Sequence, residues 1–375
     1  MLTPLDPQRL EDALSWAERG VGLTDPNPRV GCVIGREDGT LLGAGHTQQA
    51  GGAHAEVMAL RDAAASGVEV RGATAWVTLE PCAHHGRTPP CCDALIAAGI
   101  GRVVVALRDP HPQVNGEGLR RLAAAGIEVQ VLEPDHALAQ RAARLNVGFL
   151  HRVRSGRPWV RLKSAVSLDG RTALPDGRSQ WITGEAARQD GHAWRRRAGA
   201  VLTGVGTVLA DNPRLDVRLV PTAQQPLRVV VDSQWRLPPS ARVLAPPGEV
   251  LQVGVVPPPS SRRVARCSDA RQWMAPATPA GQVDLEALVV YLGSRAINEV
   301  HVEAGPTLSG ALLQAGLVDE LLVYIAPTLL GPGLPLAQLA ESRDLTSLAR
   351  WTLLSVDAVG NDVRVVALAP STAAP

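Results

Sequence analysis

The chain has 375 residues, enough for two domains or one large one, and 45% of them are hydrophobic, which suffices for packed cores. Its formal net charge of +1 and its aromatic content of 3% argue against the basic groove and stacking rings of a nucleic-acid binder. The N-terminus has no basic segment followed by an apolar run, and no apolar stretch reaches spanning length, so we expect a cytoplasmic protein without a membrane partner.

The first part of the chain alternates helices and strands. The hydrophobic periodicity and the turn residues predict helices at 7–20, 55–65, 91–98, 118–125 and 135–146, and strands at 30–34, 41–44, 73–79, 102–107 and 127–132. Such alternation is typical of an α/β layered sheet. In these sheets, functional sites gather where strands end and helices begin.

The alternation breaks at residues 148–158, and we place a domain boundary there, which predicts domains at 1–148 and 149–375. Beyond it the pattern predicts strands at 159–166, 200–203, 227–231, 299–303, 321–325 and 363–368, and helices at 185–197, 284–292 and 308–315. The Pro-rich runs at 237–248 and 256–260 predict loops or short connecting strands, and they suggest no function.

One stretch has the composition of a catalytic zinc site. Residues 78–92 read T-L-E-P-C-A-H-H-G-R-T-P-P-C-C, and His54-Ala55-Glu56 lies upstream. Zinc at a hydrolytic centre takes three nitrogen or sulfur ligands and leaves one position for water. His54, Cys82 and either Cys91 or Cys92 can supply that set, with Glu56 placed to move protons. This H-x-E…P-C pattern is the signature of zinc deaminases.

The choice between the two neighbouring cysteines favours Cys91. It directly follows Pro89-Pro90, which is typical of a helix start, where free N–H groups and the helix dipole stabilise a thiolate. The spacing is unusual, because Cys82 and Cys91 are separated by eight residues instead of two. The five cysteines of the chain suit metal binding in a reducing compartment better than a disulfide framework.

Two other functions remain open from these residues. A closed structural zinc site, with His84 or His85 as a fourth ligand, would suit a regulatory or scaffold protein. A nucleic-acid deaminase would share the zinc chemistry, but it requires the basic groove that the composition disfavours.

The second half contains two glycine turns. Residues 204–207 read G-V-G-T after a strand, and residues 304–310 read A-G-P-T-L-S-G before a helix. Glycine lets the backbone approach a phosphate closely, and helix N-termini favour anions. Neither turn is the G-x-G-x-x-G fingerprint, so each alone also fits a plain loop. Together they leave a nucleotide cofactor and a plain pair of loops about equally supported.

A few charged residues of the second half are candidates for the same site. Lys163, the only lysine, and Glu303 both lie near strand ends, where such side chains commonly reach solvent. If the two meet in a cleft, they can handle a proton. Arg195 and Arg218 are candidates for binding a substrate phosphate through forked hydrogen bonds.

These residues lie in blocks that cover nearly the whole chain, and the extended P-C-x-H-x-G-x-T-P-x-C loop is the most specific of them. The chain resembles the bifunctional riboflavin-biosynthesis deaminase/reductase family. The matching blocks are 26–34, 54–56, 78–95 and 109–118 in the first half, and 157–173, 179–183, 207–215 and 303–313 in the second. The loop also accounts for the eight-residue cysteine spacing.

The resemblance implies a fold and an activity for each half. The N-terminal domain is expected to be a cytidine-deaminase-like three-layer α/β/α domain that hydrolyses the ring amine of a diaminopyrimidinone ribosyl phosphate. The C-terminal domain is expected to be a dihydrofolate-reductase-like α/β domain that uses NADPH to reduce the ribosyl group to ribityl. The expected partner is this small molecule, and we expect a homodimer or a higher homo-oligomer.

The resemblance also assigns roles, residue by residue. In the first domain it implies Zn²⁺ on His54, Cys82 and Cys91, proton transfer by Glu56, and pyrimidine contacts from Asn27, His84 and Arg87. It implies NADPH contacts from Val166, Trp181, Thr207, Asp211, Ser233, Gly305, Pro306, Thr307, Leu308, Ser309, Gly310 and Ala311. It implies substrate contacts from Ser179, Arg195, Leu215, Arg218 and Glu303, with Lys163 as a catalytic candidate near the reacting carbon.

One position departs from the family pattern. The family tends to place a histidine seven residues before the ligand histidine, and that position is Thr47 here, with His46 one step earlier. Either the loop at 45–53 is locally rearranged or this substrate contact is lost.

Overall fold

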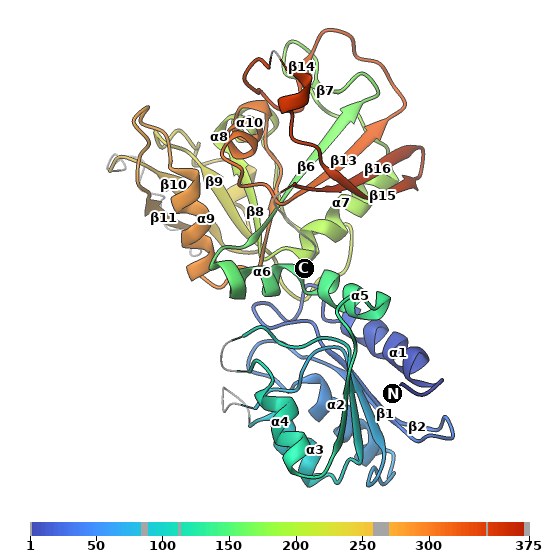
Figure 1. The fold of residues 1–375 in the computed structure, drawn as a ribbon. Coiled ribbons are helices and arrows are strands. Elements are labelled where there is room, and N and C mark those ends of the chain that lie inside the picture. The colour runs from blue at the N-terminus through green and yellow to red at the C-terminus, as the bar shows by residue number, and fades with distance from the viewer. Residues whose placement is uncertain (1, 84–88, 112–113, 258–269, 343, 371–375) are drawn as a thin grey trace. The chain divides into compact units, whose positions relative to one another are not determined.

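The computed structural model describes residues 2–83, 89–111, 114–257, 270–342 and 344–370. The chain divides into two compact units, the first ending at Ser155 and the second beginning at Gly156. Each unit is built around one large sheet (Figure 1). Within the described residues, no helix combines the length and apolarity needed to cross a membrane.

The sheet of the first unit has five strands in the order β2-β1-β3-β4-β5. They are β1 (Gly31–Gly35), β2 (Leu41–His46), β3 (Thr74–Val77), β4 (Arg102–Val105) and β5 (Glu128–Val131). β1 pairs antiparallel with both β2 and β3, whereas β3, β4 and β5 run parallel. The cysteine motif therefore follows the carboxyl end of β3, and residues 109–118 follow the carboxyl end of the neighbouring β4.

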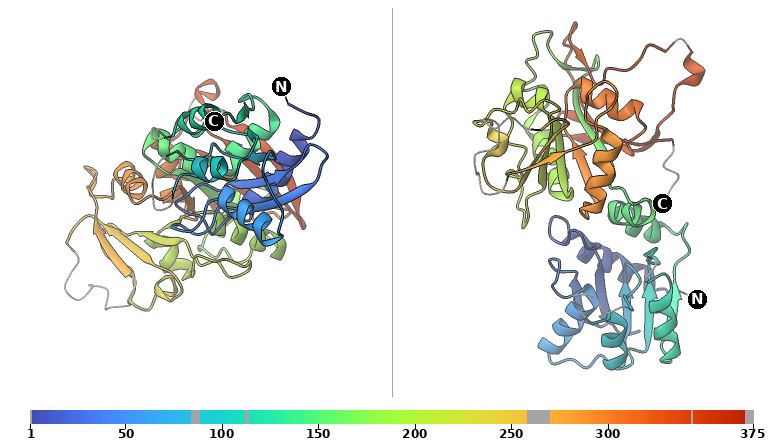
Figure 2. Two further views of the ribbon diagram at one scale, coloured as in Figure 1. Left: turned by 90° about the horizontal axis from the view of Figure 1, so that it is seen from below. Right: turned by 90° about the vertical axis from the view of Figure 1, so that its left-hand side faces the viewer.

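Helices cover both faces of this sheet, which gives three layers (Figure 2). On one face lie α1 (Asp6–Glu18) and α5 (Ala137–Leu145), and on the other lie α2 (Ala55–Ala65), α3 (Cys91–Ala97) and α4 (Glu117–Ala124). The periodicity that predicted these helices reflects burial, because their apolar faces pack on the two sides of strands rich in Val and Ala.

Between the two sheets the chain does not become irregular. Where the sequence suggested a break at 148–158, helix α6 (Val147–Ser155) follows α5 almost directly. Val147, Gly148 and Leu150 are buried, so a short apolar stripe is enough to hold the helix in place. The division between the units accordingly falls after Ser155.

The sheet of the second unit has nine strands in the order β11-β10-β9-β8-β12-β6-β13-β16-β15. The strands from β11 to β13 in that order run parallel, and β16 pairs antiparallel with both β13 and β15. The strands are β6 (Trp159–Ser167), β8 (Ala200–Gly204), β9 (Leu227–Val231), β10 (Val250–Gly254), β11 (Ala270–Met274), β12 (Glu299–Val302), β13 (Glu320–Ala326), β15 (Thr352–Val359) and β16 (Asp362–Leu368). Short strands β7 (Arg171–Ala173) and β14 (Leu334–Pro335) form a separate pair.

Helices again lie on both faces of the sheet (Figure 1). α7 (Glu185–Arg197) and α8 (Val205–Asp211) cover one face, and α9 (Leu285–Ser294) and α10 (Pro306–Gln314) cover the other. Short 3-10 turns occur at Arg242–Leu244 and Leu345–Ser347. α8 and α10 begin at the glycine turns, so the carboxyl ends of β8 and β12 deliver both turns to one edge of the sheet.

Candidate functional site: a metal centre and a cofactor pocket

Three side chains of the first unit converge on a point large enough for one metal ion. The Nδ1 atom of His54 lies 3.6 Å from Sγ of Cys82 and 3.3 Å from Sγ of Cys91. These ligand atoms all lie within 4.8 Å of one another. Tetrahedral zinc, at about 2.3 Å from sulfur and about 2.1 Å from nitrogen, separates such atoms by about 3.5 Å. The donor set therefore fits zinc in both chemistry and spacing.

Two elements position these ligands. His54 is the N-cap of α2, and Cys91 is the first residue of α3, so both sit at helix starts. α2 can approach the sheet closely because β2 carries glycine beneath it. A Cβ added to Gly43 would lie 2.3 Å from the carbonyl oxygen of Ala59.

Glu56 stands in the first turn of α2, beside the ligands. Its side chain is buried, and burial together with the charge of Cys82 raises its pKa. A carboxyl group of raised pKa can both accept and return a proton near neutral pH. The arrangement therefore places a group able to carry a proton beside three side chains that could hold a metal ion.

The structure separates the two neighbouring cysteines. The thiol of Cys92 points away from the triad and donates to the carbonyl oxygens of Pro81 and Gly118. Cys91 instead faces His54 and donates its backbone N–H to Cys82 Sγ at 3.4 Å. Cys91 therefore has the geometry of a metal ligand, whereas Cys92 packs against the backbone of Pro81 and Gly118.

Glu80 belongs to the cysteine motif, and no separate role was predicted for it. Its buried carboxylate accepts backbone N–H groups from Asp109 at 3.3 Å, from Gly116 at 3.1 Å and from Gly118 at 3.1 Å. It therefore ties the loop after β4 to the strand end that carries Cys82. Its place in T-L-E-P-C was visible in the sequence, but its three partners were not.

His46 and Thr47 end up on opposite faces of the sheet. His46 pairs with Gly31 in the ladder, and its ring stacks on Trp16 of α1 with centroids 6.1 Å apart. Thr47 is buried, and side chains alternate along a strand, so it faces α2 together with Gly45. The ladder continues to Thr47, whose N–H donates to Val30.

The expected pyrimidine contacts are only partly visible. Asn27 lies in the turn before β1, where its N–H donates to the Thr24 carbonyl and its carbonyl accepts from the Thr24 hydroxyl. His84 and Arg87, and the alternative fourth ligand His85, lie outside the described residues.

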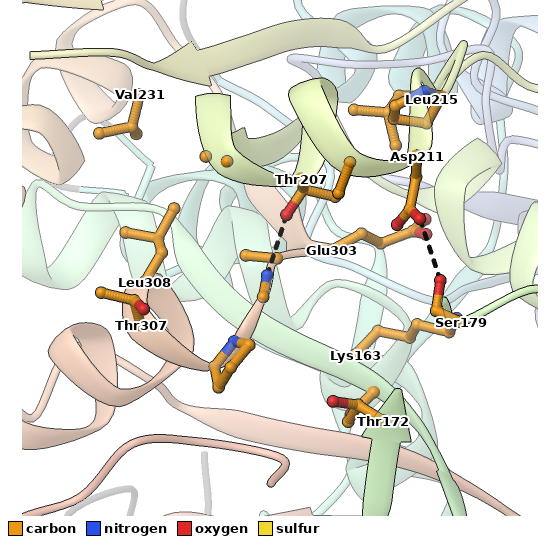
Figure 3. A pocket seen from close by; sticks show the side chains of 18 of the residues that line it. Lys163, Thr172, Ser179, Thr207, Asp211, Leu215, Val231, Glu303, Thr307 and Leu308 are labelled. Carbon is orange, nitrogen blue, oxygen red and sulfur yellow. Dashed lines mark hydrogen bonds between the residues drawn. The ribbon is translucent and has the colours of Figure 1, made fainter. Parts of the chain in front are cut away.

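The second unit contains a pocket of about 1400 Å³ at the sheet edge where α8 and α10 begin. The two glycine turns lie side by side there, because the hydroxyl of Thr207 accepts the backbone N–H of Gly305 at 3.0 Å (Figure 3). Ser179 closes another side, donating to Asp211 at 3.0 Å. Paired helix starts and glycine backbone form a cradle suited to the phosphates of a dinucleotide.

Charged groups meet deeper in the pocket. Glu303 receives two hydrogen bonds from the guanidinium of Arg195, one of them 2.8 Å from Nη2 to Oε2. Lys163 lies on the adjacent strand, because β6 and β12 pair in parallel with Leu162 opposite Val302. Burial lowers the pKa of Lys163, and the nearby Arg195 acts in the same direction while Glu303 opposes it. Lys163 and Glu303, whose role the sequence left open, therefore both line the cavity.

Most of the residues predicted for the second unit line this pocket. They are Lys163, Ser179, Trp181, Arg195, Thr207, Asp211, Leu215, Arg218, Ser233, Glu303, Gly305, Pro306, Thr307, Leu308 and Ala311. Three lie behind the lining. Val166 is buried in β6, Ser309 donates to the Ala304 carbonyl, and Gly310 packs where a Cβ would lie 2.0 Å from Gln338 O. These three shape the wall and present no side chain to the cavity.

Sequence reasoning missed two polar neighbours of this group. His192, which lines the pocket, precedes Arg195 by one helical turn, and that spacing was a readable signal. Asp216 is buried and accepts hydrogen bonds from Arg214 and Arg218, each two residues away in the sequence, so the R-L-D-V-R spacing was also a readable signal.

Comparison with known families agrees with this division. Residues 5–107 match the cytidine and deoxycytidylate deaminase zinc-binding region, and residues 158–365 match the RibD C-terminal domain. Each match contains one of the two sites described above.

Whole proteins with both parts are also similar. The riboflavin biosynthesis protein RibD of Escherichia coli is 50% identical over 346 residues, covering 87% of this chain and 89% of the relative. The structure of Acinetobacter baumannii RibD superposes with a TM-score of 0.86 at 43% identity, covering 98% and 99% of the two chains. A Thermotoga maritima deaminase/reductase structure gives a TM-score of 0.84 at 32% identity, covering 97% and 99%.

These matches confirm the resemblance on which the expected fold, the paired activities and the two cofactors were based. The chain therefore belongs to the RibD family of bifunctional riboflavin-biosynthesis enzymes, in which a zinc-binding deaminase domain precedes a reductase domain that uses NADPH.

Proposed function

We propose that the first unit deaminates diaminohydroxyphosphoribosylaminopyrimidine and that the second reduces 5-amino-6-(5-phosphoribosylamino)uracil. These are the two reactions in the name of the Thermotoga maritima relative. The observation that carries the first assignment is the convergence of His54, Cys82 and Cys91 next to the buried Glu56. The second rests on the pocket in which paired glycine turns face Lys163 and Glu303.

In the first reaction, one water replaces the ring amino group and ammonia leaves. His54, Cys82 and Cys91 would hold zinc, which would supply an activated water beside the substrate. Glu56 takes a proton from that water and returns it to the departing nitrogen, a general acid–base role worth roughly 10² to 10⁴ in rate. Asn27, with His84 and Arg87, holds the pyrimidine ring.

In the second reaction, the bond between the ribosyl C1′ and its ring oxygen breaks, and a ribityl chain results. Thr207, Asp211 and the turn from Gly305 would hold NADPH, which would supply the hydride that C1′ takes up. Lys163 gives a proton to the freed ring oxygen, and its lowered pKa makes that transfer easier. Glu303 and Arg195 orient the ribosyl group next to Lys163.

The experiment that tests both assignments measures two products from one preparation. With the diaminopyrimidinone substrate, we expect ammonia release without NADPH, and NADPH oxidation only after deamination. With chemically deaminated substrate, NADPH oxidation should begin without ammonia. NADPH oxidation that precedes ammonia release on the first substrate would contradict the assigned order.

The assembly and the compartment belong to the same proposal. We infer a homodimer or a higher homo-oligomer, because the edge strand β15 exposes Leu353, Leu354 and Val356, and such an edge suits a second copy. Light scattering in solution would show it, and a monomer at micromolar concentration would contradict it. A cytoplasmic location suits the free thiols of the cysteines in the described residues.

A further inference from the structure

His192 stands on α7 with both ring nitrogens facing N–H donors. Its Nδ1 lies 3.2 Å from the backbone nitrogen of Arg218, and its Nε2 lies 3.4 Å from Nη1 of Arg195. A neutral imidazole has only one acceptor nitrogen, so it can satisfy only one of these donors. The shorter contact assigns Nδ1 as the acceptor, which leaves an Nε2–H beside the Arg195 guanidinium. Arg195 Nη1 also donates to the Asp216 carbonyl at 3.1 Å, so among the described residues the Nε2–H of His192 is the donor that faces no acceptor.

The ring is deeply placed but still borders the pocket. Only 4% of His192 is exposed, and the residue contributes to the pocket lining. Burial lowers its pKa to about 4, assisted by Arg195 and Arg218 and opposed by Glu303 and Asp216. The imidazole is therefore neutral at physiological pH and can keep the tautomer that accepts at Nδ1.

The segment that His192 contacts is strained and held from several sides. Leu215 has φ of +56°, a left-handed conformation that is unfavourable for a branched side chain, and it is buried. Gln225 binds both the N–H and the carbonyl of Val217 at 2.8 Å. Together with the contact from His192 to Arg218, these bonds fix the backbone that carries Leu215 into the cavity. Such strain commonly persists where it orients a functional group.

The charges around this segment leave a positive surplus. The carboxylate of Asp216 accepts from Arg214 at 2.8 Å and from Arg218 at 2.7 Å, and Glu303 is paired with Arg195. Three guanidinium groups thus face two carboxylates, and 44% of the Arg218 side chain remains exposed. An anion at this place would neutralise the surplus and accept the Nε2–H of His192.

We propose that His192 is an unassigned member of the phosphate subsite for the reductase substrate, where it donates Nε2–H to a phosphate oxygen beside Arg195 and Arg218. This inference rests on the proposed reductase function. The phosphate is that of the substrate and not of the cofactor, because the glycine turns and Thr207 form a separate cradle. In Figure 3, Leu215 lies on the side of Ser179, opposite Val231, Thr307 and Leu308.

Two variants separate this role from packing. His192→Gln keeps an acceptor and a donor on one side chain, and His192→Leu removes both while filling similar space. We expect His192→Leu to lower kcat/KM for the phosphorylated substrate about tenfold or more, the value of one charge-assisted hydrogen bond. His192→Gln should stay within about threefold of the wild type.

The same assays with the substrate from which the phosphate has been removed enzymatically decide the chemistry. We expect His192→Leu and the wild type to agree within about twofold on this dephosphorylated compound. An equal loss on both compounds, or no loss on either, would overturn the phosphate role. Wild-type NADPH oxidation with the phosphorylated substrate tests the reductase function itself, so the two failures are distinguishable.

Two measurements guard against a folding defect. NADPH affinity, followed through the fluorescence of the exposed Trp181 at the pocket, should not change in either variant. If His192→Leu does not fold, thermal unfolding of the wild type and of His192→Gln is measured instead, with and without inorganic phosphate. Phosphate should then raise the thermal midpoint of both proteins, and a midpoint independent of phosphate would overturn the subsite.

Discussion

The two units use similar layers but assemble their sites in opposite ways. In the first unit, the proposed metal ligands and the proposed proton carrier all lie between residues 54 and 91, at the starts of two neighbouring helices and the end of one strand. In the second unit, the pocket draws on residues from Lys163 to Gln338, and its polar groups come from strand ends, helix starts and loops.

This difference governs what each site requires from the rest of its unit. A metal site of three ligands is specified by a few atoms of special chemistry, so a short motif can carry it. A dinucleotide pocket relies on backbone N–H groups, glycine turns and common charged residues, none of which is distinctive alone. The following substitutions test whether the two sites are as independent as this contrast implies.

The largest effect should come from Cys91→Ala. Removing one of three ligands should abolish zinc retention and reduce ammonia release to background, while reduction of pre-deaminated substrate continues. Metal analysis and both activity assays measure this. The matched control is Cys92→Ala, which removes the buried neighbouring thiol that donates to Pro81 and Gly118. Equal zinc loss in the two variants would show that the ligand assignment is wrong.

Glu56→Gln should lower the rate of ammonia release roughly 10² to 10⁴-fold, because the amide cannot carry the proton from water to the leaving nitrogen. The zinc content should stay at that of the wild type, which distinguishes a lost proton carrier from a lost metal. NADPH oxidation on deaminated substrate should be unchanged. Full deamination by this variant would refute the role of Glu56.

Glu303→Gln tests the second site in the same way. The amide would leave the Arg195 charge unpaired in a buried place, and we expect kcat/KM for reduction to fall about 10²-fold. Ammonia release should be unaffected, and a thermal unfolding curve would reveal any general loss of stability. If deamination falls equally, the two units are coupled and the contrast between them fails.

The smallest effect should follow from Thr207→Val, which keeps the shape of the side chain but removes the acceptor for the Gly305 N–H. One neutral hydrogen bond is worth about 1 kcal/mol, so KM for NADPH should rise about fivefold while kcat changes little. Thr172→Val serves as a control. The Thr172 hydroxyl also lines the pocket, but it donates to the carbonyls of Leu334 and Pro335 and does not contact the glycine turn. A larger effect on the control would argue against the cradle.

Most helices and central strands of both units were predictable from the sequence. The helices α2 and α7 have the predicted limits, because their apolar faces are regular and their starts are well marked. Strands β10, β11 and β15 were not predicted, since Pro-rich or polar neighbours obscure them and their pairing depends on distant strands. Helix α6 replaced a predicted break, because a short buried stripe was enough to stabilise it.

The kind of chemistry followed from residue types and spacing alone. Cysteine, histidine and glutamate in the H-x-E…P-C pattern have few other uses, and the glycine turns marked two helix starts. The helix start already favoured Cys91, but only the fold placed its thiol against His54, set the side of the sheet that His46 occupies, and brought Thr207 to Gly305. Those choices depend on contacts between residues far apart in the chain, and the packing of helices on a twisted sheet sets such distances, which no local pattern encodes.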